Sequence, residues 1–527
     1  MKIIWGVDRT AFERSKGAIK QFVEWDSSKI INGHILMMGG SGSGKTHNLR
    51  RMIRQMRETG PSNLRVEIFD AHGDITVDNA NDVLFSQQTH YGLNPFRVDP
   101  DPHYGGIRKT IQAFLRVLDK ASATALGSRQ VACLTNLLYD VYAEHGFKRD
   151  DATTWVINEA DTHLISSGAD NRLYLNIPKW EKDTAKQLAT IHWDGARTAW
   201  WIAPDDYHGS ITQWPPKTVG RTYPTMASVL AFAQRQLMIA RMGSDQAAVT
   251  NLEIFLRASQ SFQRRAIAQA GKQASFDNEA EQTALDKAGQ KAIDSYSEYI
   301  ESVRTGRELE MLMKYDNTEV LKSVVDRLVS LNESGLFKEE SPPFDAANPV
   351  WRYNITPMSD PEKKMFVLLR LAEIFRDAVQ RGYSDEVRHV TVLDEAHLYA
   401  DSGTPDEDDP IVKIILEGRK FGLAIVLVSQ HPGHFNPDIL SSVATKILVG
   451  IDEYFWKVTA SKMNVELQML ARILPTRTMA LQIKEKNANL SDEELARRSR
   501  QRNSWREVTL PQTRAAQASA TLRVVAS

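Results

Sequence analysis

The eight residues at 39–46 constrain the fold of this chain more than any other feature of the sequence. They read Gly-Gly-Ser-Gly-Ser-Gly-Lys-Thr and fit the pattern G-x-x-x-x-G-K-[ST] in full. A short, mainly apolar run at 34–38 precedes them, and apolar residues at helical spacing follow from Leu49 onward. Such a turn between a strand and a helix directs successive backbone N–H groups, and the positive end of the helix, at one anion. The sequence therefore predicts a phosphate-binding loop.

The loop also predicts how a nucleoside triphosphate and a metal ion are held. Glycines allow backbone dihedral angles that a Cβ atom would oppose. Lys45 should reach the β- and γ-phosphates of ATP, and the hydroxyl of Thr46 should ligate Mg²⁺. The residues assigned to cofactor binding are Gly39, Gly40, Ser41, Gly42, Ser43, Gly44, Lys45 and Thr46.

An acidic motif lies far along the chain. The apolar run at 390–393 reads as a buried strand and ends in Asp394 and Glu395. Paired with the phosphate-binding loop, Asp394 is expected to hold Mg²⁺, and Glu395 to orient and deprotonate the attacking water. Residues 394–397 also spell the DEAH string of one helicase superfamily, but the Ser-Ala-Thr motif and the second motor domain of those helicases do not follow.

Two further residues are candidates for the catalytic step. Gln430 ends a predicted buried strand and is placed to sense the γ-phosphate or fix the lytic water, with an ordinary turn residue as the alternative. A P-loop motor with one nucleotide site per chain needs an arginine from a neighbouring subunit to neutralise transition-state charge. Arg419, beside Lys420, is the candidate, and a solvated surface pair is the alternative. His72, in the turn after the predicted strand 66–70, has either a role near the nucleotide or an ordinary place in a turn.

The order of these elements predicts the domain organisation. The 527 residues are enough for two or three domains. Strand, loop, helix and strand predict an α/β core with a mainly parallel sheet, interrupted by a large, mostly helical insertion. The expected parts are one half of the core at 1–100, the inserted helical domain at 101–340, the other half of the core at 341–480 and a tail at 481–527.

The insertion contains two unusual stretches. Between about 176 and 225 it holds five tryptophans, which predict either apolar packing or a stacking platform for single-stranded bases. Around 263–292 it is polar and rich in Ala and Gln, which favours a helical hairpin or an arm. The pairs Arg264-Arg265 and Arg497-Arg498 are candidates for phosphate contacts, and solvated helix faces explain them equally well.

The overall composition limits the partners and the location. Lys and Arg number 65 and Asp and Glu 66, so no global positive charge points to nucleic acid. Cys133, in an apolar stretch, is the only cysteine, which excludes a disulfide framework and favours a core residue over a reactive thiol. No run approaches the roughly 18 apolar residues of a spanning helix, and the N-terminal apolar run is too short for a signal peptide. A cytoplasmic protein without membrane insertion is expected.

Taken in order, these pieces resemble the HerA/FtsK superfamily of ring-forming ATPases, and within it the HerA-like branch. The matching segments are 39–46, 70–74, 91–96, 393–397 and 417–432. The resemblance implies a RecA-like P-loop NTPase core whose halves are separated by a helical domain. About thirty residues before the loop are too few for the N-terminal β-barrel usual in HerA proteins. A partner, or the region 100–340, should therefore supply part of the assembly surface.

The resemblance also implies an activity and partners. It implies a homohexamer that threads double-stranded DNA through a central pore and hydrolyses ATP between subunits. Lys45, Thr46, Asp394 and Glu395 would then come from one subunit and Arg419 from its neighbour. HerA-like proteins commonly work with a nuclease or another effector. We therefore expect a DNA translocase or helicase with such a partner, in bacterial anti-phage defence or DNA processing.

Two other classes of function stay open. The string Asn-Pro-Phe at 94–96 is also similar to the ATPases of type IV secretion and conjugation systems. A cytoplasmic ATPase of such a system, moving protein rather than DNA, is the alternative. The third class is a non-motor scaffold in which nucleotide only drives the assembly of an effector.

Overall fold

The chain folds into two compact units. In the computed structural model the described residues are 1–18, 20–122, 124–157, 163–164, 166–167, 172–175, 177, 182–195, 199–214, 218–219, 222–243, 245–270, 279–302, 314–338, 340–400, 408–486 and 505–510. The sheet unit comprises Met1–Pro95, Ala113–Leu126 and Val329–Ser527, and the helical unit comprises Phe96–Gln112 and Gly127–Leu328.

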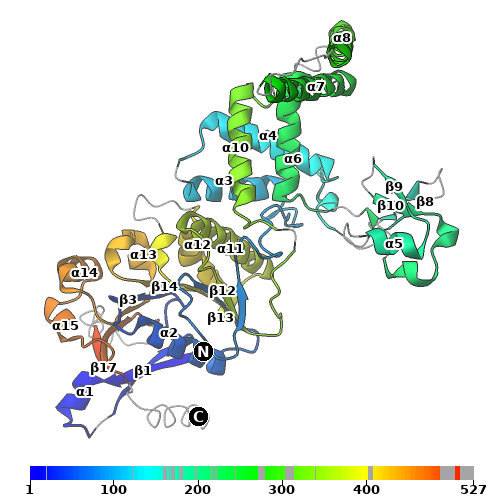
Figure 1. Ribbon diagram of the computed structural model, residues 1–527. Helices are drawn as coiled ribbons and strands as arrows, with labels where there is room; N and C mark the ends of the chain where they lie inside the picture. The colour runs from blue at the N-terminus through cyan, green and yellow to red at the C-terminus, as the bar shows by residue number, and fades with distance from the viewer. Residues whose placement is uncertain are drawn as a thin grey trace. The chain divides into compact units, whose positions relative to one another are not determined.

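An eleven-stranded sheet is the centre of the sheet unit (Figure 1). The strand order is β2-β1-β17-β16-β15-β3-β14-β13-β4-β12-β5. The strands are β1 (Lys2–Asp8), β2 (Phe22–Asp26), β3 (Ile35–Met38), β4 (Arg65–Asp70), β5 (Asn81–Leu84), β12 (Val350–Asn354), β13 (Ser384–Leu393), β14 (Phe421–Ser429), β15 (Thr445–Leu448), β16 (Thr478–Ile483) and β17 (Arg506–Thr509). Neighbours are parallel from β15 to β5 and antiparallel from β15 to β2. The predicted α/β core with a mainly parallel sheet is confirmed.

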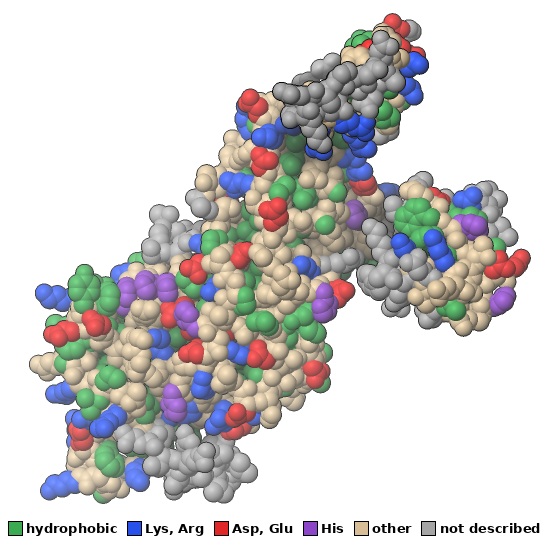
Figure 2. All heavy atoms as spheres, in the orientation of Figure 1, with side chains coloured by type: hydrophobic (Ala, Val, Ile, Leu, Met, Phe, Trp, Pro, Cys, Tyr) green, Lys and Arg blue, Asp and Glu red, His purple; other side chains and the backbone are tan. Residues whose placement is uncertain are grey.

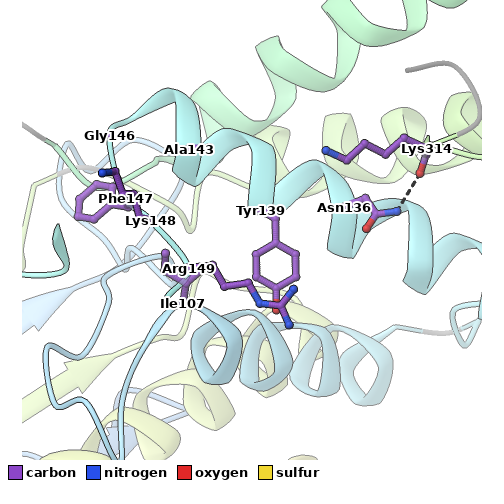
Figure 3. Close-up of a pocket in the computed structure, with 9 residues that line it drawn as sticks. All are labelled: Ile107, Asn136, Tyr139, Ala143, Gly146, Phe147, Lys148, Arg149 and Lys314. Carbon is purple, nitrogen blue, oxygen red and sulfur yellow. Dashed lines mark hydrogen bonds between the residues drawn. The ribbon is translucent and has the colours of Figure 1, made fainter. Parts of the chain in front are cut away.

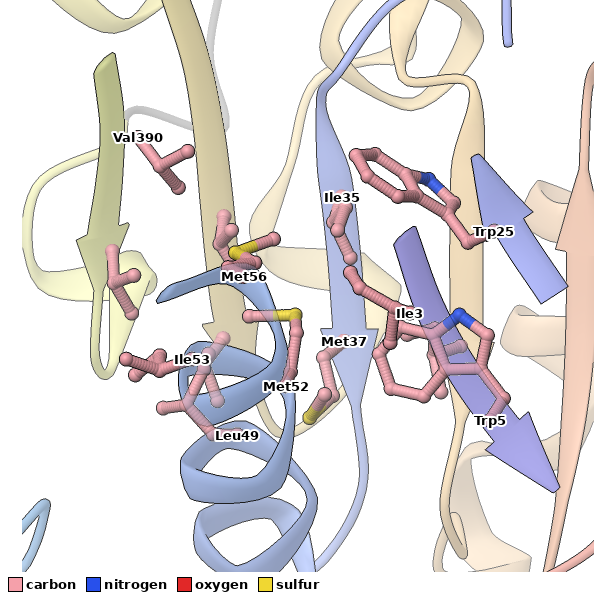
Figure 4. Packing of buried hydrophobic residues seen from close by; sticks show 14 of the residues in the cluster. Ile3, Trp5, Trp25, Ile35, Met37, Leu49, Met52, Ile53, Met56 and Val390 are labelled. Atoms are coloured by element: carbon pink, nitrogen blue, oxygen red, sulfur yellow. The ribbon is translucent and has the colours of Figure 1, made fainter. Parts of the chain in front are cut away.

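Helices cover both faces of the parallel part of this sheet. The helices of the sheet unit are α1 (Arg9–Arg14), which contacts β1 and β17 of the antiparallel part, α2 (Lys45–Thr59), α11 (Asp360–Arg381), α12 (Pro410–Glu417), α13 (Pro437–Ser442), α14 (Trp456–Met463) and α15 (Leu467–Arg472). The residues of α3 (Ile107–Ala121) are divided between the two units. On one face, the apolar stripe of α2 packs against strand residues such as Met37 and Val390 (Figure 4). On the other, Phe366 of α11 lies edge-on to Phe69 of β4, with ring centroids 6.4 Å apart. Full burial of such side chains contributes roughly 1.5–3 kcal/mol each.

The antiparallel part of the sheet joins the two ends of the described chain. β17 lies between β16 and β1, so Val508 pairs with both Met479 and Asp8. Trp5 and Trp25, from the β1–β2 hairpin, are fully buried in the same apolar core as α2 (Figure 4). The expectation of a tail at 481–527 is therefore wrong at 506–509. The residues before the loop do not form a separate domain; they extend the sheet.

The helical unit contains α4 (Ser128–Glu144), α6 (Met226–Met242), α7 (Gln246–Ala270), α8 (Glu279–Ser302) and most of α10 (Thr318–Glu333). α7 and α8 form the expected helical hairpin. Three differences from the expectation appear. The insertion begins at Phe96 rather than 101, residues 113–126 return to the sheet unit, and the unit ends at Leu328 rather than 340.

The tryptophan-rich stretch forms a small antiparallel sheet within the helical unit. Its order is β7 (Ser166–Ser167), β8 (Arg172–Leu175), β10 (Ala199–Ile202) and β9 (His192–Asp194), with α5 (Lys182–Leu188) beside it; β6 (His163–Leu164) and β11 (Thr218–Val219) pair separately. Trp214 and Trp200 pack in its core with Ile202. Trp193 is half exposed. The predicted apolar packing thus holds for Trp200 and Trp214, and base stacking stays a prediction. Trp180 lies outside the described residues.

A cavity of about 460 Å³ opens on the helical unit beside α4 (Figure 3). The Arg149 guanidinium lies 4.8 Å from the centroid of the Tyr139 ring. Lys148 and Lys314 also line the cavity, and Lys314 pairs with Asp140 at 2.6 Å. An acidic side chain thus offsets one of the cations that line the cavity. On the face drawn in Figure 2, Lys and Arg side chains are interspersed with Asp and Glu side chains over the part of the chain described.

Among the helices of the described ranges, none combines the length and apolar character needed to cross a bilayer. The expectation of a cytoplasmic protein stays a prediction.

Candidate nucleotide-binding and catalytic site

The loop at 39–46 follows β3 and is held by its neighbours. Backbone N–H groups of Gly39 and Gly40 donate to the carbonyl oxygens of Ser429 and Gly450, at 3.2 and 2.7 Å. A Cβ atom at Gly39 would lie 2.4 Å from Ser43 Oγ. Side chains larger than hydrogen therefore do not fit here, because real Cβ atoms do not approach so closely.

The backbone of the loop curls into the form that the glycine pattern predicts. Gly42 and Gly44 have positive φ angles of 72° and 96°, which favour glycine. The ammonium of Lys45 lies against the loop and donates to Gly39 O at 2.7 Å and Gly40 O at 3.1 Å. α2 begins at Lys45. The cradle, its cation and the helix N-terminus therefore face one place, as phosphate binding requires.

Three aspartates meet at the carboxyl edge of the sheet because β13 and β4 are parallel neighbours. Asp394 follows β13, Asp70 ends β4, and Asp74 lies in the turn after β4; their carboxylate oxygens lie within 4.8 Å of one another. Asp394 is 7% exposed. Burial first, then the negative charges of Glu395, Asp70 and Asp74, raise the pKa of Asp394 to about 7. A divalent cation is the species that such a cluster accommodates best.

The residues present fit Mg²⁺, which prefers oxygen ligands. The Thr46 hydroxyl donates to Asp74 Oδ2 at 3.1 Å, which joins the first turn of α2 to the aspartate cluster. Asp70 is already occupied. It accepts three backbone N–H groups of its own turn and two bonds from Arg352, at 2.9 and 2.6 Å. Thr46, Asp394 and Asp74 are therefore the groups available to a metal ion, and Asp70 shapes the turn that carries Asp74.

Glu395 has an unusual backbone and close neighbours. Its φ and ψ are 46° and 51°, left-handed values that are uncommon outside glycine. Its Oε2 lies 3.0 Å from His397 Nδ1, and its Oε1 lies 3.9 Å from His72 Nε2. The contact with His397 lowers the pKa of Glu395 against the opposing effect of burial, and the charges of Lys45 and His72 add to it. Glu395 is thus kept ionised, as a general base must be.

Gln430 and Arg419 lie at opposite ends of β14. Gln430 is exposed and directly follows Ser429, whose carbonyl accepts the hydrogen bond from Gly39, so it lies beside the loop. Arg419 is exposed in the short turn before Phe421, the first residue of β14. Nine strand residues rise roughly 30 Å. The structure therefore brings Gln430 to the nucleotide site of its own chain and leaves Arg419 at the far edge of the sheet.

Sequence reasoning missed two features of this site. Arg352 is buried in β12 and pairs with Asp70 across the sheet, and a cation in the middle of an apolar strand was the available signal. His397, His431 and His434 lie beside Glu395, but their spacing in the sequence gives no sign of it. Of the pairs considered for phosphate contacts, Arg264 and Arg265 lie on α7, and Arg497 and Arg498 lie outside the described residues.

The loop after β3, the helix that follows it and the acids after the neighbouring parallel strands define a P-loop nucleotide-binding protein with a RecA-like core. A family described as the type IV secretion-system coupling protein DNA-binding domain matches residues 27–97. A domain of unknown function, DUF5710, matches residues 172–216. Taken with the relatives below, these observations make the chain similar to P-loop ATPases of the HerA/FtsK type.

The curated relatives match in part of their length. A probable helicase of Methanocaldococcus jannaschii is 28% identical over 173 residues, which is 30% of this chain and 32% of the relative. The DNA double-strand break repair helicase HerA of Pyrococcus furiosus is 41% identical over 63 residues, 12% of this chain and 11% of that protein. The chain thus spans about a third of the length of the first relative.

Solved structures align with most of the chain. VirB4 of Thermoanaerobacter pseudethanolicus aligns with a TM-score of 0.51 at 13% identity, covering 94% of this chain and 97% of VirB4. The plasmid coupling protein TrwB in complex with ADP and Mg²⁺ aligns with a TM-score of 0.43 at 12% identity, covering 98% and 94%. The likeness to VirB4 confirms the RecA-like fold class.

Proposed function

We propose that this chain binds ATP with Mg²⁺ and hydrolyses it as one subunit of a ring. The loop at 39–46 holds the phosphates, and Thr46 and Asp394 hold the metal. Mg²⁺ neutralises phosphate charge when it is bound. Glu395 accepts a proton from the attacking water, and Gln430 orients that water or senses the γ-phosphate. The proximity of Lys45, Asp394 and Glu395 supports these roles. The charge of Lys45 lowers the pKa of Glu395, and the charge of Glu395 raises the pKa of Asp394.

The position of Arg419 is the observation that supports assembly into a ring. An arginine that neutralises transition-state charge must reach the γ-phosphate. Arg419 lies at the amino end of β14, whereas the loop lies at the carboxyl end of the same sheet. We infer that it serves a neighbour's site, so that the catalytic centre is completed only between subunits. A homohexamer is the proposed assembly.

Mixing two inactive variants tests this arrangement. Glu395→Gln keeps Arg419, and Arg419→Ala keeps Glu395, so a neighbouring pair with one of each contains one complete site. Each variant alone should lose ATPase activity, and an equimolar mixture should recover about a quarter of the wild-type rate if sites act independently. Arg14→Ala, an exposed arginine of α1, is the matched control and should keep full activity. A mixture as inactive as its components contradicts the shared site.

We further propose that the ring moves double-stranded DNA, as a translocase or helicase with a separate nuclease or effector, in anti-phage defence or DNA processing. The similarity to helicases, including a HerA protein, supports DNA as the substrate. Steady-state ATPase rates with and without duplex DNA, at low and high salt, test it, because phosphate contacts weaken steeply with salt. Duplex DNA that neither binds nor raises turnover at low salt rules out the translocase. Co-purification with a nuclease tests the effector.

A type IV secretion or conjugation ATPase is the second candidate. The match of residues 27–97 to a coupling-protein domain and the fold shared with VirB4 favour it. It predicts co-purification with an envelope complex and ATPase activity that duplex DNA leaves unchanged. A stable complex with a nuclease would count against it.

A further inference from the structure

Three histidines and one phenylalanine form a continuous stack beside Glu395. The ring centroids of His397 and His434 lie 4.6 Å apart, with 30° between the ring planes. Those of His434 and His431 lie 3.9 Å apart. His431 stacks in turn on Phe455, at 4.0 Å and 12°. We call these four residues the histidine stack. Three of them lie in short turns, at 396–398, 432–434 and 453–455, and His431 directly precedes the second turn.

The histidine stack connects Glu395 to the carboxyl end of β14. At one end, His397 Nδ1 lies 3.0 Å from Glu395 Oε2. In the middle, His434 Nδ1 lies 2.8 Å from the hydroxyl of Ser429, the buried last residue of β14. Gln430 follows Ser429 directly. The stack therefore joins the two positions at which a lytic water would be held in this chain. A group of histidine side chains is visible on the surface of this unit in Figure 2.

The stack is suited to a positional role rather than an acidic one. Burial and the neighbouring imidazoles lower the pKa of His434 to about 4 and lower that of His431 as well. These two rings are uncharged at neutral pH, so they pack against each other, with 43° between the ring planes, without repulsion. Packed rings restrict the rotamers of His397, and His397 in turn limits where the Glu395 carboxylate points.

We propose that His397 is a positioning residue for Glu395, fixed in its rotamer by contact with His434, His431 and Phe455. A misplacement of about 1 Å at a reacting group costs on the order of 100-fold in rate. The left-handed backbone of Glu395 sets the direction in which its side chain leaves the main chain, and the ring beside it limits the remaining torsions. The inference rests on the proposed function, because it takes Glu395 as the residue that activates water.

Substitutions in the full chain test the inference. His397→Ala should lower the kcat for ATP about 10- to 100-fold and leave KM and nucleotide affinity within about twofold. His397→Asn should recover most of the loss, because its amide nitrogen can take the place of Nδ1. Phe455→Ala, at the other end of the stack, should lower kcat by less, with the same unchanged KM. His208→Ala, an exposed histidine of the helical unit, is the control and should match the wild type.

The Glu395→Gln background separates this inference from the proposed function. There, His397→Ala should have no further effect on the residual rate, since a positioning residue acts only through its partner. If Glu395→Gln abolishes hydrolysis and His397→Ala keeps the wild-type kcat, the inference fails and the proposed function stands. If Glu395→Gln keeps the wild-type rate, the proposed function itself fails. The inference also fails if His397→Ala lowers kcat and nucleotide affinity together, or if His397→Asn recovers nothing.

Discussion

Replacing Arg370 with methionine should destabilise the sheet unit, and the loss should depend on pH. Glu67 of β4 is 1% exposed and pairs with Arg370 of α11 at 2.9 Å. Tyr353 donates to the same carboxylate at 2.8 Å, and His389 lies 3.4 Å from it. Burial alone would raise the pKa of Glu67, but Arg370, followed by His389, holds it well below its ordinary range. Loss of the guanidinium leaves a buried carboxylate without its main counter-charge.

The size of the effect follows from that burial. Removing one partner of a buried ion pair costs about 3–5 kcal/mol, a large share of a typical stability of roughly 5–15 kcal/mol. In the wild type, the lowered pKa of Glu67 contributes stability at neutral pH that is lost as the pH falls through the folded-state pKa. In Arg370→Met, burial dominates and raises the pKa above its unfolded value. Protonation of Glu67 then removes the buried charge. The loss in free energy of unfolding relative to the wild type should therefore shrink between pH 7 and about pH 5.

Urea unfolding followed by tryptophan fluorescence, at pH 7 and pH 5, measures both features. Arg381→Met, in the exposed last turn of the same helix, is the matched control and should change stability little. The double variant Glu67→Gln, Arg370→Met should recover part of the loss, because it removes the stranded charge. A deficit below about 1 kcal/mol at pH 7, or one that is equal at both pH values, would refute the reasoning.

Three further predictions concern the loop and the antiparallel strands. Gly39→Ala should abolish ATP binding in a nucleotide titration and lower the free energy of unfolding by about 1–3 kcal/mol. Gly40→Ala is the control and should fold normally, because a Cβ at Gly40 meets only Gly450 O, at 3.8 Å. Equal melting temperatures for the two variants would contradict the prediction. Trp25→Phe removes a buried hydrogen bond from Nε1 to Thr445 Oγ1 (2.9 Å) and should cost about 1–3 kcal/mol in urea unfolding; an unchanged midpoint would show that this bond contributes nothing. Val508→Asp places a carboxylate at a fully buried position of β17 and should release the β1–β2 hairpin from the sheet. Hydrogen exchange should then become faster at 2–8 and 22–26, while α2 stays protected. Wild-type protection of the hairpin would count against the prediction.

The parallel half of the fold could be predicted because each element carries a local signal. Gly39 to Thr46 specify a strand, a tight turn and a helix within a few residues, and the run before Asp394 is too apolar to lie anywhere but inside. β3, α2, β4, β13 and β14 accordingly lie where the pattern placed them. The likeness to VirB4 confirms the fold class that these elements imply.

The antiparallel half could not be predicted, because its pairing is non-local. β17 is four residues long and isolated in the sequence, and only contact with β1 and β16 makes it a strand. The site shows the same limit. The pattern placed Asp394 and Glu395 correctly at the edge of the sheet, whereas the neighbours that set their charge, Asp74 and His397, are brought there by turns. Arg352 contacts Asp70 only because β12 pairs with β4, and no pattern of neighbouring residues predicts that pairing.

The position of β17 has a consequence for the order of folding during synthesis. Val7 pairs with Thr509, so the phosphate-binding loop, the helical unit and the aspartates Asp70, Asp74 and Asp394 are all made between the two partners. The β1–β2 hairpin leaves the ribosome early, with Trp5 and Trp25 ready for a core whose last strand does not yet exist. Its edge stays open until β17 arrives, and contacts of such long sequence separation form slowly. A nascent chain of this protein should therefore engage chaperones through its first strands, even after Ser429 and Gly450 have been made and hold the nucleotide loop.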